Sequence, residues 1–310
     1  MVGLSIDEVA DRLAAGPLAA RTERDRSLGL FTTYRVGGSA SLFVFIDSRA
    51  DVDTLVDVIA GAGVSTLVVG RGSNMLVSDS GFEGVAIVLG DGLGGLHIDD
   101  SSVRAEAAVP LPVAARASVA AGLAGFEWAV GVPGSIGGAI RMNAGGHGSD
   151  MAATVVSARV ADLVTGEVRE WSPAELAFGY RESAIEAHHL VIEATLALHP
   201  GSVAAGEDAL SEVVRWRREH QPGGQNAGSV FTNPEGDSAG RLIDAAGGRG
   251  LRIGTAEVST KHANFIQADP GGAADDVYAV MRAVRDLVRE HHGVDLDVET
   301  RLVGFGDQAW

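Results

Sequence analysis

The spacing of apolar residues predicts alternating strands and helices over the first ninety positions. Apolar side chains run without interruption through Leu42–Ile46, as in a buried strand, and then recur at 52, 55, 56 and 59, which is the spacing of one helix face. Leu67–Val69 forms a second apolar run. These segments predict a strand, a helix and a strand that leads directly into Gly70–Asn74.

The rest of the chain mixes strands and helices without a long repeat. In the middle third we expect strands at about 95–109, 153–171 and 190–198, a helix near 112–122 and a glycine-rich stretch at 131–148. In the last third we expect helices near 206–220, 238–246 and 273–292, followed by an alternating strand at 296–302. The turn-forming residues His199–Ser202 predict a domain boundary near residue 200.

The excess of acidic over basic residues disfavours polyanionic partners. The 310 residues contain 24 Lys and Arg against 41 Asp and Glu, so the formal net charge is −17. This charge repels phosphate backbones and anionic lipids, and we expect binding to neither nucleic acid nor membranes. Lys261 is the only lysine, and its context Thr260-Lys261-His262 excludes a P-loop, which needs Gly-Lys-Ser/Thr.

The absence of cysteine excludes several kinds of chemistry. Without cysteine there are no disulfides, thiolate metal sites, thiol nucleophiles or cysteinyl flavin links. The composition fits a reducing cytoplasm. Ser5–Glu8 has the spacing of a helix capping box rather than of a secretory signal, and no apolar run approaches the roughly 18–20 residues of a membrane span. We therefore expect a soluble, cytoplasmic protein.

Two glycine-rich segments are candidates for binding a phosphate-containing ligand. Gly70–Asn74 follows a predicted strand, and bare glycine amides together with Ser and Asn can hold a phosphate, although a tight turn explains the same residues. Gly131–Gly138, followed by Asn143–Gly146, can lie against a dinucleotide or be a surface loop. One such segment in each of two subdomains favours a shared dinucleotide.

Other candidate residues are ambiguous from the sequence alone. Arg181 can pair with a carboxylate or phosphate, or form a surface salt bridge, and Ser229 can face a pocket or satisfy a turn. Ser229 does not stand in a Gly-x-Ser-x-Gly elbow, so its segment gives no support to a hydrolase nucleophile. The pairs His188-His189 and His291-His292 lack metal-ligand partners at helical or finger spacing, so we interpret them as surface residues.

Six segments in order resemble the UDP-N-acetylenolpyruvoylglucosamine reductase family, flavoenzymes of peptidoglycan precursor synthesis. They span nearly the whole chain, from about residue 28 to residue 304. The segments are Thr33–Gly38, Val69–Val77, Gly131–Gly138, Tyr180–Ser183, Gly228–Pro234 and Lys261–Ile266.

The resemblance implies an α+β protein with a vanillyl-alcohol-oxidase-type (PCMH-type) FAD-binding fold. It implies two FAD-binding subdomains, at 1–90 and 91–200, and a C-terminal α+β substrate-binding domain at 201–300. The end of the chain, 300–310, is expected to return to the first subdomain.

The resemblance also implies FAD held without a covalent bond, and NADPH as the reductant. The residues expected to bind FAD are Tyr34, Arg35, Gly70, Arg71, Gly72, Ser73, Asn74, Met75, Pro133, Gly134, Ser135, Gly137, Gly138, Asn143, Ala144 and Gly145.

Three positions match the family's catalytic residues: Arg181, Ser229 and Glu299. The implied reaction passes a hydride from the flavin N5 to C3 of the enolpyruvyl substrate, and negative charge develops at C2. Arg181 and a protonated Glu299 would stabilise that enolate, and Ser229 would protonate C2.

The resemblance implies UDP-N-acetylglucosamine enolpyruvate as the substrate and UDP-N-acetylmuramate as the product. The candidate substrate-binding residues are Tyr180, Gln221, Asn233, Arg241, Lys261, His262 and Asn264. Thr232 replaces the family's usual lysine, and about 45 residues between Arg181 and Ser229 are too few for the substrate-capping insert of the longer subtype.

Two other functions fit parts of the pattern. A different FAD oxidoreductase of the same fold could act on a sugar or hydroxy acid, and a nucleotide-binding protein could use the glycine segments without redox chemistry. Flavin absorbance of the purified protein would distinguish both enzymes from the nucleotide-binding protein. NADPH oxidation that depends on the enolpyruvyl substrate would distinguish the reductase from the other FAD oxidoreductase. We expect a monomer whose partners are small molecules.

Overall fold

The computed structural model describes residues 3–306, which divide into two compact units. Unit 1 comprises residues up to Arg24, Ser41–Arg71 and Gly84–Arg217, and unit 2 comprises the intervening segments and everything from Arg218 onward. The helices are α1 Ile6–Ala14, α2 Arg49–Ile59, α3 Leu111–Ala120, α4 Ile136–Met142, α5 Pro173–Leu176, α6 Val203–His220, α7 Ala239–Ala245 and α8 Ala274–His292. Strand and helix content is mixed, as predicted for an α+β protein.

The strands are mostly short and form six sheets. They are β1 Thr22–Ser27, β2 Ser39–Ile46, β3 Thr66–Val69, β4 Met75–Val77, β5 Phe82–Leu89, β6 Leu96–Asp99, β7 Ser102–Glu106, β8 Leu123–Ala124, β9 Gly145–Gly146, β10 Ser149–Asp150, β11 Val155–Asp162, β12 Val168–Trp171, β13 His189–Ala197, β14 His199–Pro200, β15 Arg252–Ile253, β16 Ala256–Val258, β17 Ile266–Ala268 and β18 Arg301–Val303.

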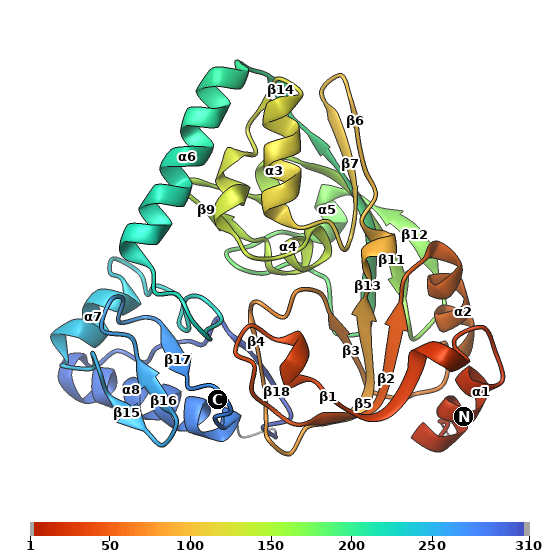
Figure 1. Ribbon diagram of the computed structural model, residues 1–310, viewed down its shortest axis with the longest axis horizontal. Coiled ribbons are helices and arrows are strands. Elements are labelled where there is room, and N and C mark those ends of the chain that lie inside the picture. The colour runs from red at the N-terminus through yellow and green to blue at the C-terminus, as the bar shows by residue number, and fades with distance from the viewer. Residues whose placement is uncertain (1–2, 307–310) are drawn as a thin grey trace. The chain divides into compact units, whose positions relative to one another are not determined.

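Unit 1 contains two hydrophobic cores. The first core joins α1 and α2 to strands β2 and β5, with Leu13, Leu42 and Leu55 almost completely buried. The second core lies between α3, α4 and a five-stranded antiparallel sheet of order β12-β11-β13-β7-β6 (Figure 1), and includes Phe126 and Ile140. These apolar faces are the ones that the period-3.6 and period-2 patterns predict.

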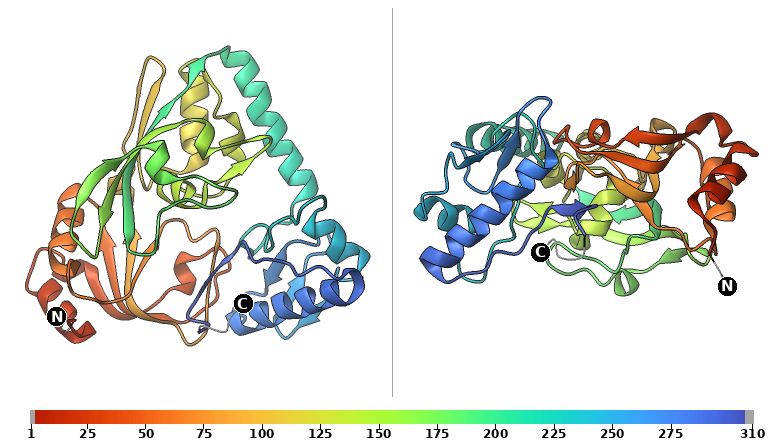
Figure 2. Two further views of the ribbon diagram at one scale, coloured as in Figure 1. Left: turned by 180° about the vertical axis from the view of Figure 1, so that it is seen from behind. Right: turned by 90° about the horizontal axis from the view of Figure 1, so that it is seen from below.

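Unit 2 is built around helix α8. Its apolar face, which includes Val277, Val280 and Val284, packs on the three-stranded sheet β15-β16-β17 (Figure 2) and contributes to a third core with Tyr34 and Phe231. The third core therefore combines side chains of the 25–40 segment with those of the C-terminal third. The predicted three-domain division at residues 90 and 200 stays a prediction.

Most predicted elements are present, with three differences. The capping box is confirmed, since Ser5 Oγ accepts from Glu8 N–H and the Glu8 carboxylate accepts from Ser5 N–H. The glycine-rich stretch 131–148 is not all loop, because α4 forms within it. The predicted strand at 296–302 is wrong, since β18 covers only 301–303 and Val298 makes an isolated bridge. Helix α6 begins at Val203, three residues before the predicted start.

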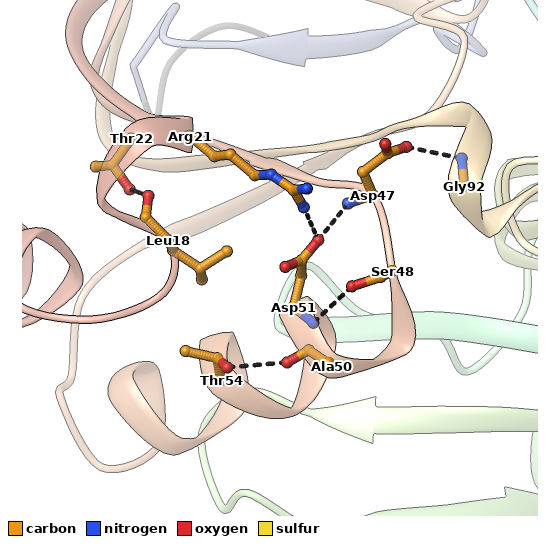
Figure 3. A network of polar contacts seen from close by, with 9 residues as sticks. All are labelled: Leu18, Arg21, Thr22, Asp47, Ser48, Ala50, Asp51, Thr54 and Gly92. Atoms are coloured by element: carbon orange, nitrogen blue, oxygen red, sulfur yellow. Dashed lines mark hydrogen bonds and ion pairs between the residues drawn. The ribbon is translucent and has the colours of Figure 1, made fainter.

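A polar cluster stabilises the start of α2. The Asp51 carboxylate accepts hydrogen bonds from Arg21 and from Asp47 N–H, the latter at 2.8 Å, while Ser48 Oγ accepts from Asp51 N–H (Figure 3). The Asp47 side chain extends the cluster to Gly92 N–H at 2.7 Å. Because Asp51 is 8% exposed, its partners would be left without an acceptor in a largely dry site if it were removed.

We predict that Asp51→Ala lowers the free energy of unfolding by about 2 kcal/mol, since it leaves Asp47 N–H and the Arg21 guanidinium unpaired. Chemical denaturation measures the effect. Asp286→Ala is the matched control, because it removes only an exposed ion pair with Arg289 on α8 and is expected to change stability by less than about 0.5 kcal/mol. Equal effects of the two substitutions would contradict the role of this cluster.

Candidate functional site

In unit 1 the two glycine-rich segments approach each other. Gly70 follows β3, and a Cβ at this position would lie 2.8 Å from Ser135 Oγ. Ser135 precedes α4 and is 1% exposed, and its hydroxyl has no hydrogen-bond partner among residues 3–306. A buried hydroxyl without a protein partner is expensive, so it indicates a place for a ligand's polar group.

Main-chain hydrogen bonds fix the second glycine segment on the end of β7. Ile136 N–H donates to Val109 O and Gly137 N–H donates to Ala107 O, both at 3.0 Å. A Cβ at Gly137 would lie 3.0 Å from Ala107 Cβ, closer than most such contacts, so glycine suits this close approach. The segment is therefore held on the core of unit 1 rather than being a flexible surface loop.

Arg181 lies in a tight turn. Gly179 and Glu182 pair with each other on either side of Tyr180 and Arg181, with Gly179 N–H donating to Glu182 O at 3.0 Å. Arg181 adopts a φ of +61°, in the left-handed region that non-glycine residues seldom occupy. Its guanidinium carbon lies 5.3 Å from the centre of the Tyr180 ring, and Tyr180 is 63% exposed.

Helix α4 holds this turn in place. At its C-terminus, Asn143 Nδ2 donates to Gly179 O at 2.8 Å, and Ser183 Oγ donates to Arg141 O at 2.8 Å. Asn143 Oδ1 in turn accepts from Ala152 N–H at 3.0 Å. The predicted cofactor residue Asn143 thus uses both ends of its side chain inside the protein, and its visible role is to position the turn that carries Arg181.

In unit 2, Ser229 and Glu299 are brought together although 70 residues separate them. Val230, next to Ser229, accepts a hydrogen bond from Glu299 N–H at 2.8 Å, and Phe231 forms an isolated antiparallel bridge with Val298. Ser229 and Glu299 are both half-buried. The sequence predicts both residues, but only the fold shows that their main chains meet.

Asn264 fixes the segment that follows Ser229. Val230 N–H donates to Asn264 O at 2.9 Å, Phe231 N–H donates to Asn264 Oδ1 at 3.0 Å, and Asn264 Nδ2 donates to Phe231 O at 2.8 Å. Asn264 is 3% exposed. We list it among substrate-binding candidates from the sequence, whereas the structure shows its side chain fully used on the Phe231 main chain.

The first glycine segment is also linked to Glu299. Asn74 Nδ2 donates to Glu299 O at 3.1 Å, and β4 pairs in parallel with β18 from the next residue, Met75, opposite Arg301. This pairing involves residues 301–303, while the predicted return of 300–310 to the first subdomain stays a prediction. Residues 307–310 of that prediction lie outside the described part of the chain.

The other cofactor candidates differ in accessibility. Tyr34 is completely buried, and burial raises the pKa of its phenol, while the Arg35 guanidinium donates to Leu30 O at 2.9 Å. Gly72 is buried with a φ of +58°, and a Cβ there would clash with Phe31 O. The exposed or half-buried candidates are Arg71, Ser73, Met75, Pro133, Gly134, Gly138, Ala144 and Gly145.

Most substrate candidates in unit 2 already have protein partners. The Lys261 ammonium donates to Arg218 O, at the C-terminal end of α6, at 2.5 Å. Arg241 pairs with Asp237 through its Nε at 2.6 Å, and both are accessible enough for a ligand to compete. The lone lysine therefore has a visible structural role as a helix cap.

Asn233 and His262 flank the helix α7 region. Asn233 Oδ1 accepts from Ala239 N–H at 3.1 Å, which helps to cap α7. His262 Nδ1 accepts from Asn264 N–H at 3.2 Å, and burial lowers the pKa of the imidazole, with a contribution from the Arg249 charge. A neutral His262 can still donate a hydrogen bond through its other ring nitrogen.

A cluster of Asp162, His188 and His189 was not expected from the sequence. The three side chains offer ligand atoms within 4.8 Å of one another, although Asp162 is not at helical or finger spacing from the histidine pair. However, Asp162 Oδ1 accepts from the N–H groups of Val164 and Thr165, and His189 Nδ1 accepts from a main-chain N–H. In these bonds the Asp162 and His189 side chains each accept from main-chain N–H groups a few residues away, so they stabilise two turns, and this accounts for the cluster without a metal ion.

Sequence reasoning missed the groups that hold the candidate residues. Ser183 belongs to the Tyr-Arg-Glu-Ser segment but was given no role, and it anchors the Arg181 turn. Its signal is weak, because a serine after a turn has many explanations. The carbonyl of Val230, which receives Glu299 N–H, leaves no signal in the sequence at all.

Comparisons with known proteins agree over most of the chain. Residues 40–172 match a model of an FAD binding domain, and residues 220–303 match the UDP-N-acetylenolpyruvoylglucosamine reductase C-terminal domain. Proteins named UDP-N-acetylenolpyruvoylglucosamine reductase are similar to it. That of Rubrobacter xylanophilus is 38% identical over 90% of this chain and 94% of its own, and that of Heliobacterium modesticaldum is 41% identical over 88% of both chains.

A solved structure supports the same comparison. The crystal structure of UDP-N-acetylenolpyruvylglucosamine reductase (MurB) from Thermus caldophilus superposes with a TM-score of 0.79 at 33% identity, covering 91% of this chain and 99% of that chain. Across the described residues, no helix is long and apolar enough to cross a bilayer.

We predict that Ser135→Ala does not lower the thermal stability of the flavin-free protein, because the buried hydroxyl has no protein partner to lose. The same change should weaken FAD binding by about tenfold, as expected for one lost hydrogen bond. Thermal unfolding and titration with FAD measure the two effects.

The control is Ser118→Ala, a serine buried to the same degree whose Oγ donates to Ala114 O at 2.9 Å within α3. It should lower stability slightly and leave FAD affinity unchanged. FAD affinity at the wild-type level in Ser135→Ala would contradict our interpretation of this hydroxyl.

Proposed function

The chain belongs to the UDP-N-acetylenolpyruvoylglucosamine reductase family, and on that premise we propose how its own residues carry out the reduction. It is an FAD-containing, NADPH-dependent oxidoreductase that reduces UDP-N-acetylglucosamine enolpyruvate to UDP-N-acetylmuramate in peptidoglycan precursor synthesis. The observation that carries the proposal is the meeting of Ser229 and Glu299 through the bond between Glu299 N–H and Val230 O.

The residues of the glycine segments fit FAD. The buried hydroxyl of Ser135 and the cradle that a Cβ at Gly70 would fill are both features that a diphosphate or a flavin edge can use. Bound FAD supplies the redox chemistry, since it accepts a hydride from NADPH and donates a hydride to C3 of the enolpyruvyl group. The chain contains no cysteine, which excludes a cysteinyl link, and we propose that FAD is held by non-covalent contacts.

Arg181 and Glu299 are proposed to stabilise the charge that develops on the substrate. When C3 gains a hydride, the electron pair of the C2–C3 double bond moves to C2 and is delocalised into the neighbouring carboxylate. A guanidinium can bind that carboxylate in bidentate fashion, and a protonated Glu299 can donate a hydrogen bond to it. The left-handed backbone of Arg181 and its anchors on α4 would pre-organise the guanidinium for this contact.

Ser229 is proposed to deliver the proton to C2. Its Oγ–H bond breaks as the C2–H bond forms, and the alkoxide regains a proton from water. A serine hydroxyl is a weak acid, but the enolate is strongly basic, and a fixed geometry makes the transfer effective. The bonds of Asn264 and Glu299 to Val230 and Phe231 supply that fixed geometry on the main chain that follows Ser229.

The uridine diphosphate end of the substrate is assigned to the C-terminal part of the chain. We propose Tyr180, Asn233, Arg241, Lys261 and His262 as contacts, with residues 201–300 acting as the substrate-binding domain. Arg241 is the strongest of these, because its partner Asp237 is accessible and can release the guanidinium to a diphosphate. Such a contact would replace the lysine that the family usually has at Thr232.

The small-molecule substrate and NADPH are the partners that the family implies. We propose that the protein acts as a monomer in the cytoplasm, which agrees with the absence of cysteine. A net charge of −17 disfavours nonspecific binding to nucleic acids and anionic membranes.

We predict that Ser229→Ala retains FAD and is reduced by NADPH at the wild-type rate, but is reoxidised by the enolpyruvyl substrate at least about 10³-fold more slowly. The loss follows from removal of the only proposed proton donor to C2. Anaerobic stopped-flow absorbance of the flavin separates the two half-reactions.

Ser172→Ala provides the control, since Ser172 caps α5 and should affect stability by about 1 kcal/mol without slowing either half-reaction. Full turnover by Ser229→Ala would remove the serine from the mechanism while leaving the family assignment intact.

A further inference from the structure

Asn74 makes two hydrogen bonds to the main chain at and just after Glu299. Its side-chain Nδ2 donates to Glu299 O at 3.1 Å, and its own main-chain carbonyl accepts from Arg301 N–H at 3.0 Å. The parallel ladder of β4 and β18 starts only one residue later, at Met75 opposite Arg301. The Asn74 side chain thus continues the hydrogen bonding between the two segments as far as Glu299, which lies outside any strand.

The other main-chain polar group of Glu299 is fixed as well. Its N–H donates to Val230 O at 2.8 Å, so the peptide groups on both sides of the Glu299 Cα are bound, one to the Ser229 segment and one to Asn74. Because the main chain on both sides of the Glu299 Cα is bound, the position and direction of its Cα–Cβ bond are fixed, and the carboxyl group can move only through the side-chain torsions.

We propose that Asn74 is a positioning residue for Glu299, which couples the glycine segment Gly70–Asn74 to the carboxyl group that acts on the substrate. The proposal rests on the proposed role of Glu299. It adds a specific function for the Asn74 amide, which the sequence pattern assigns only to cofactor binding. The Asn74 side chain therefore connects the segment expected to bind FAD to Glu299, the residue proposed to stabilise the enolate.

An ordinary strand end does not account for this contact. The ladder needs main-chain groups only, and any residue at position 74 could supply the carbonyl that Arg301 N–H uses. A donor that reaches Glu299 O must come from the side chain, and an asparagine amide has the right length and carries an N–H group. Alanine and aspartate both lack that donor, which makes the contact separable from the ladder.

The test uses Asn74→Ala and Asn74→Asp in the full chain loaded with FAD. Because Asn74 is also a candidate FAD contact, both variants are compared with the wild type at saturating FAD, and NADPH-driven reduction of the bound flavin serves as the reference half-reaction. Reoxidation by UDP-N-acetylglucosamine enolpyruvate should slow by about 10- to 100-fold, the cost expected for a reacting group displaced by roughly 1 Å. Steady-state kcat should fall with little change in the substrate KM.

Asp79→Ala is the matched control for stability. Asp79 lies on the same 72–83 segment, and its carboxylate accepts from Ala274 N–H and Asp275 N–H, both at 3.0 Å, where it caps α8. This variant should lower the melting temperature at least as much as Asn74→Ala, but it should leave the reoxidation rate within about threefold of wild type. Equal slowing by both variants would show a merely structural effect and overturn the proposal.

A double-mutant cycle with Glu299→Gln gives the decisive comparison. If Asn74 acts through Glu299, Asn74→Ala should slow reoxidation of the Glu299→Gln enzyme by less than about threefold, far less than in the wild-type background. Additive effects, or an equal slowing of NADPH-driven reduction, would overturn the proposal. Failure of the proposed function is visible separately, since the wild-type protein would then not be reoxidised by the substrate, or Glu299→Gln would be fully active.

Discussion

The hydrogen bond from Glu299 N–H to Val230 O is the interaction on which the placement of Glu299 beside the Ser229 segment depends. It joins two segments 70 residues apart and places the main chain of Glu299 beside that of Ser229. Asn264 fixes one side of this junction and Asn74 the other. The proposed catalytic residues are single side chains on short irregular segments, which would be mobile without these bonds.

Unit 1 uses the same device for Arg181. The guanidinium is carried by a turn with a strained left-handed residue, and Asn143 and Ser183 tie that turn to the end of α4. Asparagine suits this task in both units because its amide offers a donor and an acceptor on a short side chain, and so can replace a missing main-chain partner. In both cases, a glycine-rich segment expected to hold FAD leads to an asparagine that anchors the main chain near a proposed catalytic residue.

Much of the fold could be predicted because its elements follow regular periods. The α2 and α8 faces and the Ser5 cap repeat at intervals that the sequence displays directly. The strand expected at 296–302 failed, because alternation reports which faces are buried, whereas a ladder needs a partner strand. The two glycines of α4 obscured the helix in the sequence; Gly137 lets the main chain approach Ala107, and neither glycine prevents the helix.

The sequence allowed candidate site residues to be named, but not the hydrogen bonds that hold them in place. Asn264 also hydrogen-bonds to Phe231 O, and Lys261 to Arg218 O in α6, while their roles in substrate binding stay predictions. Such long-range partners depend on tertiary folding, which local spacing does not encode.

The most direct test of the function is anaerobic mixing of the NADPH-reduced protein with UDP-N-acetylglucosamine enolpyruvate while flavin absorbance is followed. We predict full return of the oxidised flavin spectrum with stoichiometric UDP-N-acetylmuramate. A flavin that stays reduced until oxygen is admitted would contradict the account.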